Sequence, residues 1–76
     1  MEKVIKFLIK NGYKEDSEKE GVYRSFFKDG MSTINVNALE TVFTDGIVEW
    51  LTIPTNIYAL IGALLHHRQI AFIYEC

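Results

Sequence analysis

GVYRSFFKDGMSTINVNALETVFTDGIVEWLTIP (residues 21–54) contains two Asp-Gly pairs, each of which stands between two runs rich in aromatic and β-branched residues. Runs of this composition are typical of β-strands. Asp29-Gly30 and Asp45-Gly46 suit tight turns, because glycine readily adopts the positive φ that a two-residue hairpin loop requires. The stretch therefore predicts two antiparallel β-hairpins that form one sheet.

The first hairpin is predicted to have one covered face and one face in water. A two-residue turn at Asp29-Gly30 makes one face mostly apolar. Its members are Tyr23, Ser25, Phe27, Ser32, Ile34 and Val36. The opposite face is mixed and is expected to contact water, with Phe26 as its exposed aromatic side chain. This face consists of Arg24, Phe26, Lys28, Thr33, Asn35 and Asn37.

The second hairpin, residues 39–53, permits two registers. A two-residue turn at Asp45-Gly46 places Phe43 opposite Val48. A three-residue turn with a glycine bulge is slightly preferred, because it gathers four apolar side chains on one face. These are Leu39, Phe43, Ile47 and Leu51. The other face then carries Glu40, Val42, Val48 and Trp50.

Residues 2–11 are predicted to form an amphipathic helix. Apolar side chains recur at one-and-four spacing and make one stripe. The stripe is Val4, Ile5, Leu8 and Ile9, and the opposite side carries Lys3, Lys6 and Lys10. Gly12 suits the left-handed conformation that closes a helix, so Tyr13 is expected to fold back onto the stripe. The charged residues 14–20 are predicted to form a solvated loop.

A second helix is predicted over residues 56–67. Pro54 ends the preceding strand because it has no backbone N–H for the ladder, and Thr55, or else Asn56, supplies the N-cap. Apolar residues lie nearly all round this helix, which predicts burial on more than one side. Gly62 lies on a thin edge where another backbone is expected to come close. Residues 70–75 favour a short C-terminal strand over continued helix.

These elements define a single small α+β domain over residues 1–76, with both helices packed on the same face of the sheet. The chain has one cysteine, so no internal disulfide can form, which fits a reducing compartment. Lysines interrupt the N-terminal apolar run, unlike a signal peptide, and no apolar run approaches the roughly 20 residues that span a bilayer. We therefore expect a soluble, cytoplasmic protein without membrane contact.

The residues near the end of the chain have the chemistry of a metal or catalytic site but not its spacing. His66 and His67 are adjacent, so on a helix they point about 100° apart and cannot chelate one ion as a one-and-four pair does. At a helix end, with Arg68, they suit the negative end of the helix dipole. Cys76 is the last residue, where a chain seldom holds a catalytic geometry. We expect no catalytic, cofactor-binding or metal-binding residue and no enzymatic activity.

Charge is segregated along the chain, because seven of the eight Lys and Arg residues lie in the first 28 positions and the central part is acidic. An aromatic side chain within a field of one charge sign is typical of protein interfaces. The predicted interface residues are Trp50, Glu40, Glu49, Asp45, Phe26, Tyr58 and Gly62. The acidity favours a basic protein partner, and the surplus of apolar side chains favours a homodimer.

The leading hypothesis is therefore a non-enzymatic protein–protein interaction module, namely a small inhibitor, adaptor or accessory protein. Its size would suit a phage or other mobile element, where it would act on a host defence protein. One alternative is a nucleic-acid-binding module that uses Lys3, Lys6 and Lys10, although a pI near 5.6 is low for that class. Another alternative is a small-molecule binder with a pocket between helix 56–67 and the sheet.

Overall fold

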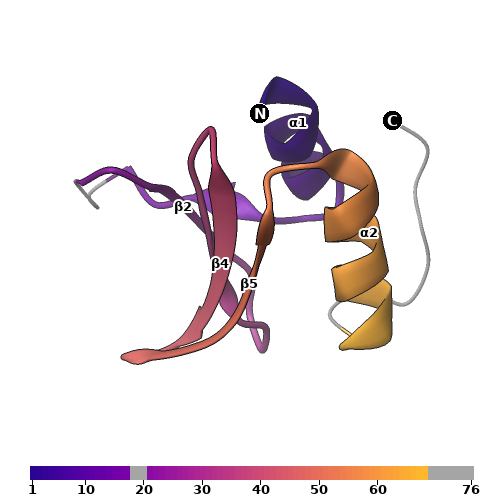
Figure 1. Cartoon of the computed structure of the whole chain (residues 1–76). Helices are drawn as coiled ribbons and strands as arrows, with labels where there is room; N and C mark the ends of the chain where they lie inside the picture. The colour runs from indigo at the N-terminus through magenta and orange to yellow at the C-terminus, as the bar shows by residue number, and fades with distance from the viewer. Residues whose placement is uncertain (18–20, 69–76) are drawn as a thin grey trace.

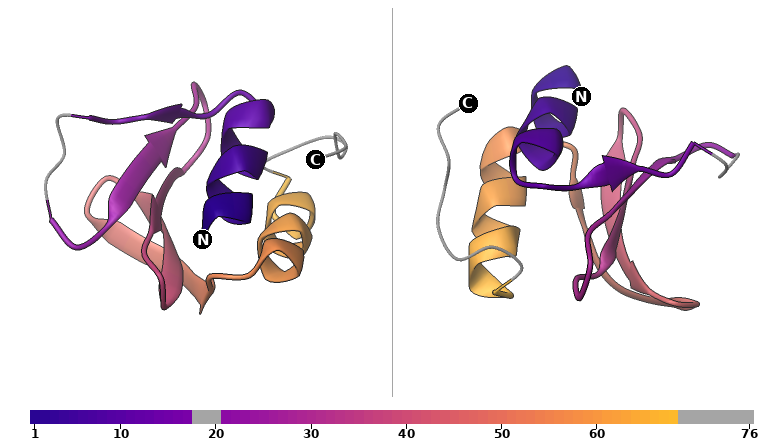
Figure 2. Two further views of the ribbon diagram at one scale, coloured as in Figure 1. Left: turned by 90° about the horizontal axis from the view of Figure 1, so that it is seen from above. Right: turned by 180° about the vertical axis from the view of Figure 1, so that it is seen from behind.

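Two helices cover one face of a five-stranded antiparallel sheet (Figures 1 and 2). The structure is a computed structural model that describes residues 1–17 and 21–68. Its elements are α1 (Glu2–Lys10), β1 (Lys14–Glu15), β2 (Arg24–Phe27), β3 (Thr33–Val36), β4 (Glu40–Asp45), β5 (Val48–Pro54) and α2 (Ile57–His66). The strands lie in the sheet in sequence order, from β1 to β5. The predicted α+β class, with antiparallel hairpins in one sheet and both helices on one face, is confirmed.

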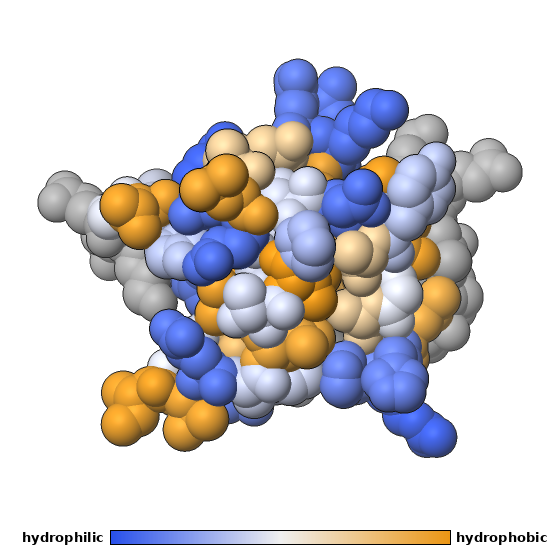
Figure 3. Space-filling view, viewed as in Figure 1, coloured by the Kyte–Doolittle hydropathy of each residue, from blue (hydrophilic) through white to orange (hydrophobic). Residues whose placement is uncertain are grey.

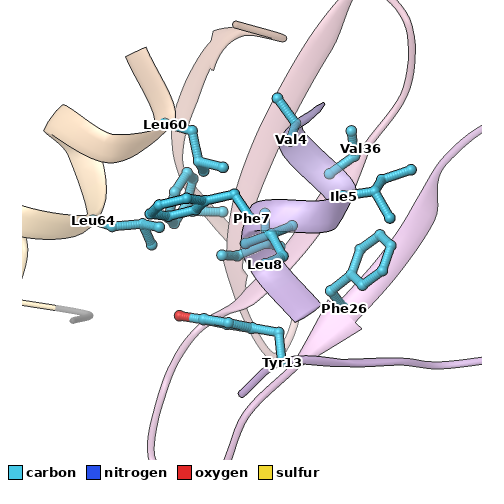
Figure 4. Packing of buried hydrophobic residues seen from close by; sticks show 11 residues of the cluster. Val4, Ile5, Phe7, Leu8, Tyr13, Phe26, Val36, Leu60 and Leu64 are labelled. Carbon is cyan, nitrogen blue, oxygen red and sulfur yellow. The ribbon is translucent and has the colours of Figure 1, made fainter. Parts of the chain in front are cut away.

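α1 forms where the sequence predicts it, and its end turns the chain back under the helix. Gly12 has φ +91°, a left-handed conformation that glycine adopts without strain. The turn places the Tyr13 ring in the core, as predicted. The predicted stripe is wrong at one position, since Ile9 is exposed and Phe7 is buried. The reason is the neighbouring α2, toward which Phe7 points (Figure 4).

The charged segment after α1 is partly a strand. β1 pairs Lys14 with Phe27 and Glu15 with Phe26, which makes it an edge of the sheet. Charged side chains suit an edge strand, because they discourage pairing with other chains. The Arg24 side chain donates two hydrogen bonds to the Glu15 carboxylate, 2.8 Å from Nε and 2.7 Å from Nη2. The predicted solvated loop is therefore wrong over these two residues.

The register of the β2–β3 hairpin differs by one residue from the predicted one. Phe26 pairs with Ile34. The connection is longer than two residues, since β2 ends at Phe27 and β3 begins at Thr33. Because successive strand side chains point to opposite faces, a shift of one residue exchanges the two faces. Phe26 is accordingly fully buried and Phe27 is 42% exposed, so the predicted positions of both side chains are wrong.

Neither predicted register of the β4–β5 hairpin is correct at the turn. Asp45 pairs with Val48, so the two-residue loop is Gly46-Ile47 and begins one residue later than predicted. Gly46 has φ +61°, which places the glycine at the first position of the loop. Ile47 is consequently 100% exposed at the tip of the hairpin. Leu39, at the other end of the predicted apolar set, is exposed as well.

A β-bulge at Trp50 shifts the register within the same hairpin. Thr44 pairs with Glu49 whereas Phe43 pairs with Leu51, so Trp50 is the extra residue of β5. A bulge bends a strand and redirects its side chains. Trp50 and Leu51 both pack against the core, and the predicted placement of Trp50 on the opposite face is wrong. Phe43 and Leu51 do share a face, as the preferred register predicted.

α2 begins and ends close to the prediction, with Asn56 and not Thr55 as its N-cap. The Asn56 side chain accepts hydrogen bonds from the backbone N–H groups of Tyr58, at 2.8 Å, and Ala59, at 3.2 Å. The Thr55 hydroxyl donates instead to a backbone carbonyl of the β3–β4 connection, at 2.6 Å. The expected close backbone approach at Gly62 is wrong, since an added Cβ atom would meet nothing within 4 Å in the described part of the chain.

A hydrophobic cluster lies between the two helices and the sheet (Figure 4). Its buried members are Val4, Ile5, Phe7, Leu8, Tyr13, Phe26, Ile34, Val36, Phe43, Leu60 and Leu64. Both helices and three strands contribute to it, so this cluster determines how the two helices lie against each other. The strand predicted at residues 70–75, and Cys76, lie outside the described residues.

Candidate functional site

A groove of about 500 Å³ lies between α1 and α2 on the surface of the protein. Its lining consists of Lys3, Lys6, Lys10, Ile57, Tyr58 and Ile61. The sequence predicted a pocket between α2 and the sheet, but this groove opens beside α1. Toward the sheet, α2 presents Leu60 and Leu64, which are fully buried.

Helix periodicity explains why these side chains meet. The three lysines are spaced by three and four residues, so they lie along one side of α1. In α2, Leu60 and Leu64 face the core, and Ile57 and Ile61 lie to one side of them, only partly buried. Tyr58 is 80% exposed. The contact between the helices then places the lysine side of α1 beside the isoleucines of α2.

The groove combines an apolar floor with three ammonium groups. Lysine stems can lie along apolar surface while their charged ends stay in water. No carboxylate from residues 1–17 or 21–68 lines the groove, so the charged groups of its described lining are all positive. Such a site favours a ligand that carries an apolar group with negative charges beside it.

The uncovered face of the sheet is polar and internally hydrogen-bonded. The Tyr23 hydroxyl donates to the Glu40 carboxylate. This hydrogen bond, followed by burial and by the negative charges of Glu40 and Glu49, raises the pKa of Tyr23. Nearby, Ser25 Oγ donates to Asn35 Oδ1 at 2.7 Å. Two of the predicted acidic residues, Glu40 and Glu49, thus lie on this face, and the Glu40 carboxylate already accepts a hydrogen bond from Tyr23.

Trp50 is held by a chain of hydrogen bonds that ends at Asp45. Trp50 Nε1 donates to Ser32 Oγ at 3.1 Å, and Ser32 Oγ donates to Asp45 Oδ1 at 2.7 Å. The Trp50 ring also lies edge-on to Phe43, with 5.4 Å between ring centroids. These contacts satisfy the indole N–H and anchor the ring in the core. The predicted exposure of Phe26 is wrong, because the ring is fully buried, whereas Trp50 is partly buried and its participation in an interface stays a prediction.

The other predicted interface residues are accessible but are not gathered into one surface. Glu40 and Glu49 belong to the open face of the sheet, whereas Tyr58 and Gly62 are exposed on α2. Asp45 is exposed at the β4–β5 turn. Of these residues, Tyr58 is the one that lines the α1–α2 groove. Their participation in an interface stays a prediction.

The two histidines lie at the end of α2, as predicted. His66 is its last residue and His67 is its C-cap. The two rings are 4.8 Å apart edge to face, and the His67 ring is also 4.8 Å from Trp50. Within the described ranges, 1–17 and 21–68, no group of three His, Cys, Asp or Glu residues is placed to hold a metal ion.

Sequence reasoning did not single out Ile57 and Ile61. Their signal is the one-and-four spacing beside Tyr58, but in a helix that is apolar nearly all round this spacing indicates only general burial. The lysine side of α1 was recognised, but nothing local to either helix indicates that the two surfaces meet. That information lies in the packing of the core.

No family model matches the chain, and neither a curated protein nor a solved structure matches it. Neither helix in the described part of the chain has the length and apolar content needed to cross a membrane. The function is therefore inferred from the chemistry of the groove and of the sheet surface.

Proposed function

We propose that the chain is a non-enzymatic protein-binding module and that the α1–α2 groove is its binding site. The observation that carries this proposal is Tyr58, which is 80% exposed beside Ile57 and Ile61. Tyrosines surrounded by apolar side chains often supply much of the binding energy of a protein interface. The lysines along the groove would orient a partner and speed its approach.

The partner segment that fits this groove is amphipathic, with one or two apolar anchors and acidic residues beside them. An amphipathic helix docks in a groove through anchors spaced by three and four residues. The spacing of Lys3, Lys6 and Lys10 matches acidic residues repeated along one side of such a helix. The groove therefore selects for negative charge and apolar shape together.

A module of this kind would act as a small inhibitor, adaptor or accessory protein, by covering a surface of another protein. The expected cytoplasmic location and the phage or mobile-element role are compatible with this mode of action. Glu49, on the open face of the sheet, remains predicted to meet a basic partner. In that case the groove and the open face bind partners of opposite charge.

Selection from a displayed library of random helical peptides, with the whole chain as the target, tests the proposal. We expect the enriched peptides to combine apolar anchors with Asp or Glu. Their affinity for Tyr58→Asp should fall by roughly tenfold or more. Val22→Asp is the matched control, because Val22 is exposed away from the groove and its replacement should leave affinity within about twofold. Failure to enrich any sequence, or binding indifferent to Tyr58→Asp, would refute the proposal.

Nucleic-acid binding is the second candidate, because Lys3, Lys6 and Lys10 are all exposed on one side of α1. Contacts from these lysines to phosphates would make the affinity fall steeply with salt. Lys6→Gln should then weaken binding to DNA or RNA of any sequence in a mobility-shift assay at low salt. If the wild-type chain shifts neither nucleic acid at low salt, this candidate is excluded and the peptide-binding proposal is unaffected.

A small-molecule ligand is the third candidate, because a groove of about 500 Å³ is within the range of ligand sites. The matching ligand would be an anion with an apolar body. A panel of anionic metabolites should then include one that raises the melting temperature of the wild type but not of Tyr58→Asp. A panel without any such compound would count against this candidate.

A further inference from the structure

The β4–β5 turn has the composition of a binding element. Ile47 is 100% exposed, and Val48 is exposed beside it. Asp45 and Glu49 flank these two residues and are both exposed. Figure 3 shows hydrophobic side chains projecting at this end of the sheet. Transfer of an isoleucine side chain out of water lowers the free energy. An apolar tip between two carboxylates therefore favours a partner that is apolar and basic.

The α1–α2 groove is complementary to this turn in polarity and in charge. The groove presents Tyr58 and two isoleucines beside three lysines, and the turn presents two aliphatic side chains between two carboxylates. We propose that the β4–β5 turn of one molecule docks in the α1–α2 groove of a second copy of the chain. Ile47 would contact Tyr58, and Asp45 and Glu49 would face the lysines. This inference rests on the proposed function of the groove and names its occupant.

The occupant has to come from another molecule. The β4–β5 turn lies at the end of the sheet remote from α1, and this separation is visible from the front and from behind (Figures 1 and 2). The turn therefore cannot reach the groove of its own chain. The two surfaces differ, so each copy offers one turn and one groove. If two copies dock reciprocally, they form a closed dimer, whereas one-way docking produces an open linear oligomer.

The turn is held in one conformation before it binds. Its two-residue loop is closed by the pairing of Asp45 with Val48. Ser32 Oγ donates to Asp45 Oδ1 at 2.7 Å, which ties the start of the loop to the body of the sheet. A carboxylate can accept several hydrogen bonds, so Asp45 can also face a lysine. An element that is ordered in advance loses less conformational entropy when it docks.

Two variants and their mixture test self-docking by sedimentation equilibrium. Ile47→Lys removes the apolar anchor and adds a positive charge to the turn, but leaves the groove intact. Tyr58→Asp places a carboxylate in the groove, but leaves the turn intact. Both positions are exposed, so circular dichroism should report a folded protein in each case. Val22→Asp is again the control, because it touches neither surface.

We expect the average mass of the wild type and of Val22→Asp to rise above 8.8 kDa with concentration, and added salt to weaken this association. Each of the other two variants alone should remain monomeric. Their equimolar mixture should form a one-to-one complex, because one intact turn then meets one intact groove. Restored association of two defective proteins is an outcome that damage to the fold would not produce.

The proposal is overturned if the wild type stays at 8.8 kDa at every concentration, if association survives Ile47→Lys, or if the mixture does not recombine. None of these results affects peptide selection by the groove, which is measured separately. Conversely, a groove that selects no peptide refutes the proposed function, whatever the mass of the wild type. The two failures are therefore distinguishable.

Discussion

Replacing Tyr13 by phenylalanine is expected to stabilise the protein. The side chain is only 2% exposed, and its hydroxyl has no hydrogen-bond partner among the described residues. A buried hydroxyl without a partner has lost its bonds to water, at a cost of about 1–3 kcal/mol. Phenylalanine fills the same space without that cost. Tyr13→Phe should therefore raise the free energy of unfolding by about 1 kcal/mol at neutral pH.

The difference in free energy of unfolding between Tyr13→Phe and the wild type should widen at alkaline pH. Burial raises the pKa of Tyr13 from 10.0 to about 12. A group whose pKa is raised by folding contributes its stability below the unfolded pKa and loses it as the pH rises through the folded pKa. The free energy of unfolding of the wild type should thus fall, relative to that of Tyr13→Phe, by about 1.3 kcal/mol at about pH 11 and by about 2 kcal/mol at about pH 12. Phenylalanine does not ionise, so the variant lacks this loss.

Urea unfolding followed by circular dichroism, at neutral pH and at about pH 11, measures both quantities. The other ionising groups are common to the two proteins and largely cancel in the difference. If Tyr13→Phe is the less stable protein at neutral pH, the reasoning is wrong and the hydroxyl has a partner in the folded state. If the difference is the same at both pH values, the pKa of Tyr13 is not raised. Tyr58→Phe, at an exposed position, is the control and should leave the free energy of unfolding at neutral pH close to that of the wild type.

Leu64→Ala should lower the free energy of unfolding by about 2–5 kcal/mol in urea, and Leu65→Ala clearly less, because Leu64 is buried and Leu65 is partly exposed. Asn56→Ala should cost about 1 kcal/mol in thermal unfolding through the lost N-cap, and Asn56→Asp should retain most of the stability. The hydrogen bonds from Arg24 lower the pKa of Glu15 from its usual 4.5. The pair therefore stabilises the fold at pH values above 4.5, and this stabilisation is lost as the pH falls through the lowered pKa. Glu15→Gln should therefore be less stable than the wild type at neutral pH, with a gap that closes in acid; a persistent gap would contradict the pairing.

Helices and their ends could be predicted because their signals are local. Gly12 adopts the left-handed conformation predicted from its place after an amphipathic segment. β5 ends at Pro54, whose ring nitrogen carries no N–H. Asn56, which the sequence offered as the alternative to Thr55, caps α2 through its own side chain. In each case the responsible atoms lie within a few residues along the chain, so the sequence contains the whole cause.

Strand register could not be predicted, because residues far apart in the sequence decide it. Phe26 and Phe27 offer the same hydrophobic gain on burial, and Phe26 is the one that joins the cluster formed with both helices, β3 and β4. At the bulge, the indole N–H of Trp50 likewise donates to Ser32, which lies in the distant β2–β3 connection. A register that is wrong by one residue reverses the faces of a strand, which is why Phe26, predicted to be exposed, proved to be a core residue.

The candidate site likewise has some features that the sequence predicts and others that only the tertiary structure explains. The sequence by itself determined the lysine side of α1, the apolar character of α2 and the approximate places of the two turns, but not the lengths of the turns, since helix periodicity and glycine conformation depend only on nearby residues. Only the tertiary structure decided that Lys6 lies beside Ile57 and Tyr58, and that Ile47 occupies the tip of a turn. The physical reason is that a groove is formed by the distance and angle between two helices. Those quantities are set by a core that side chains of both helices and of the sheet fill together.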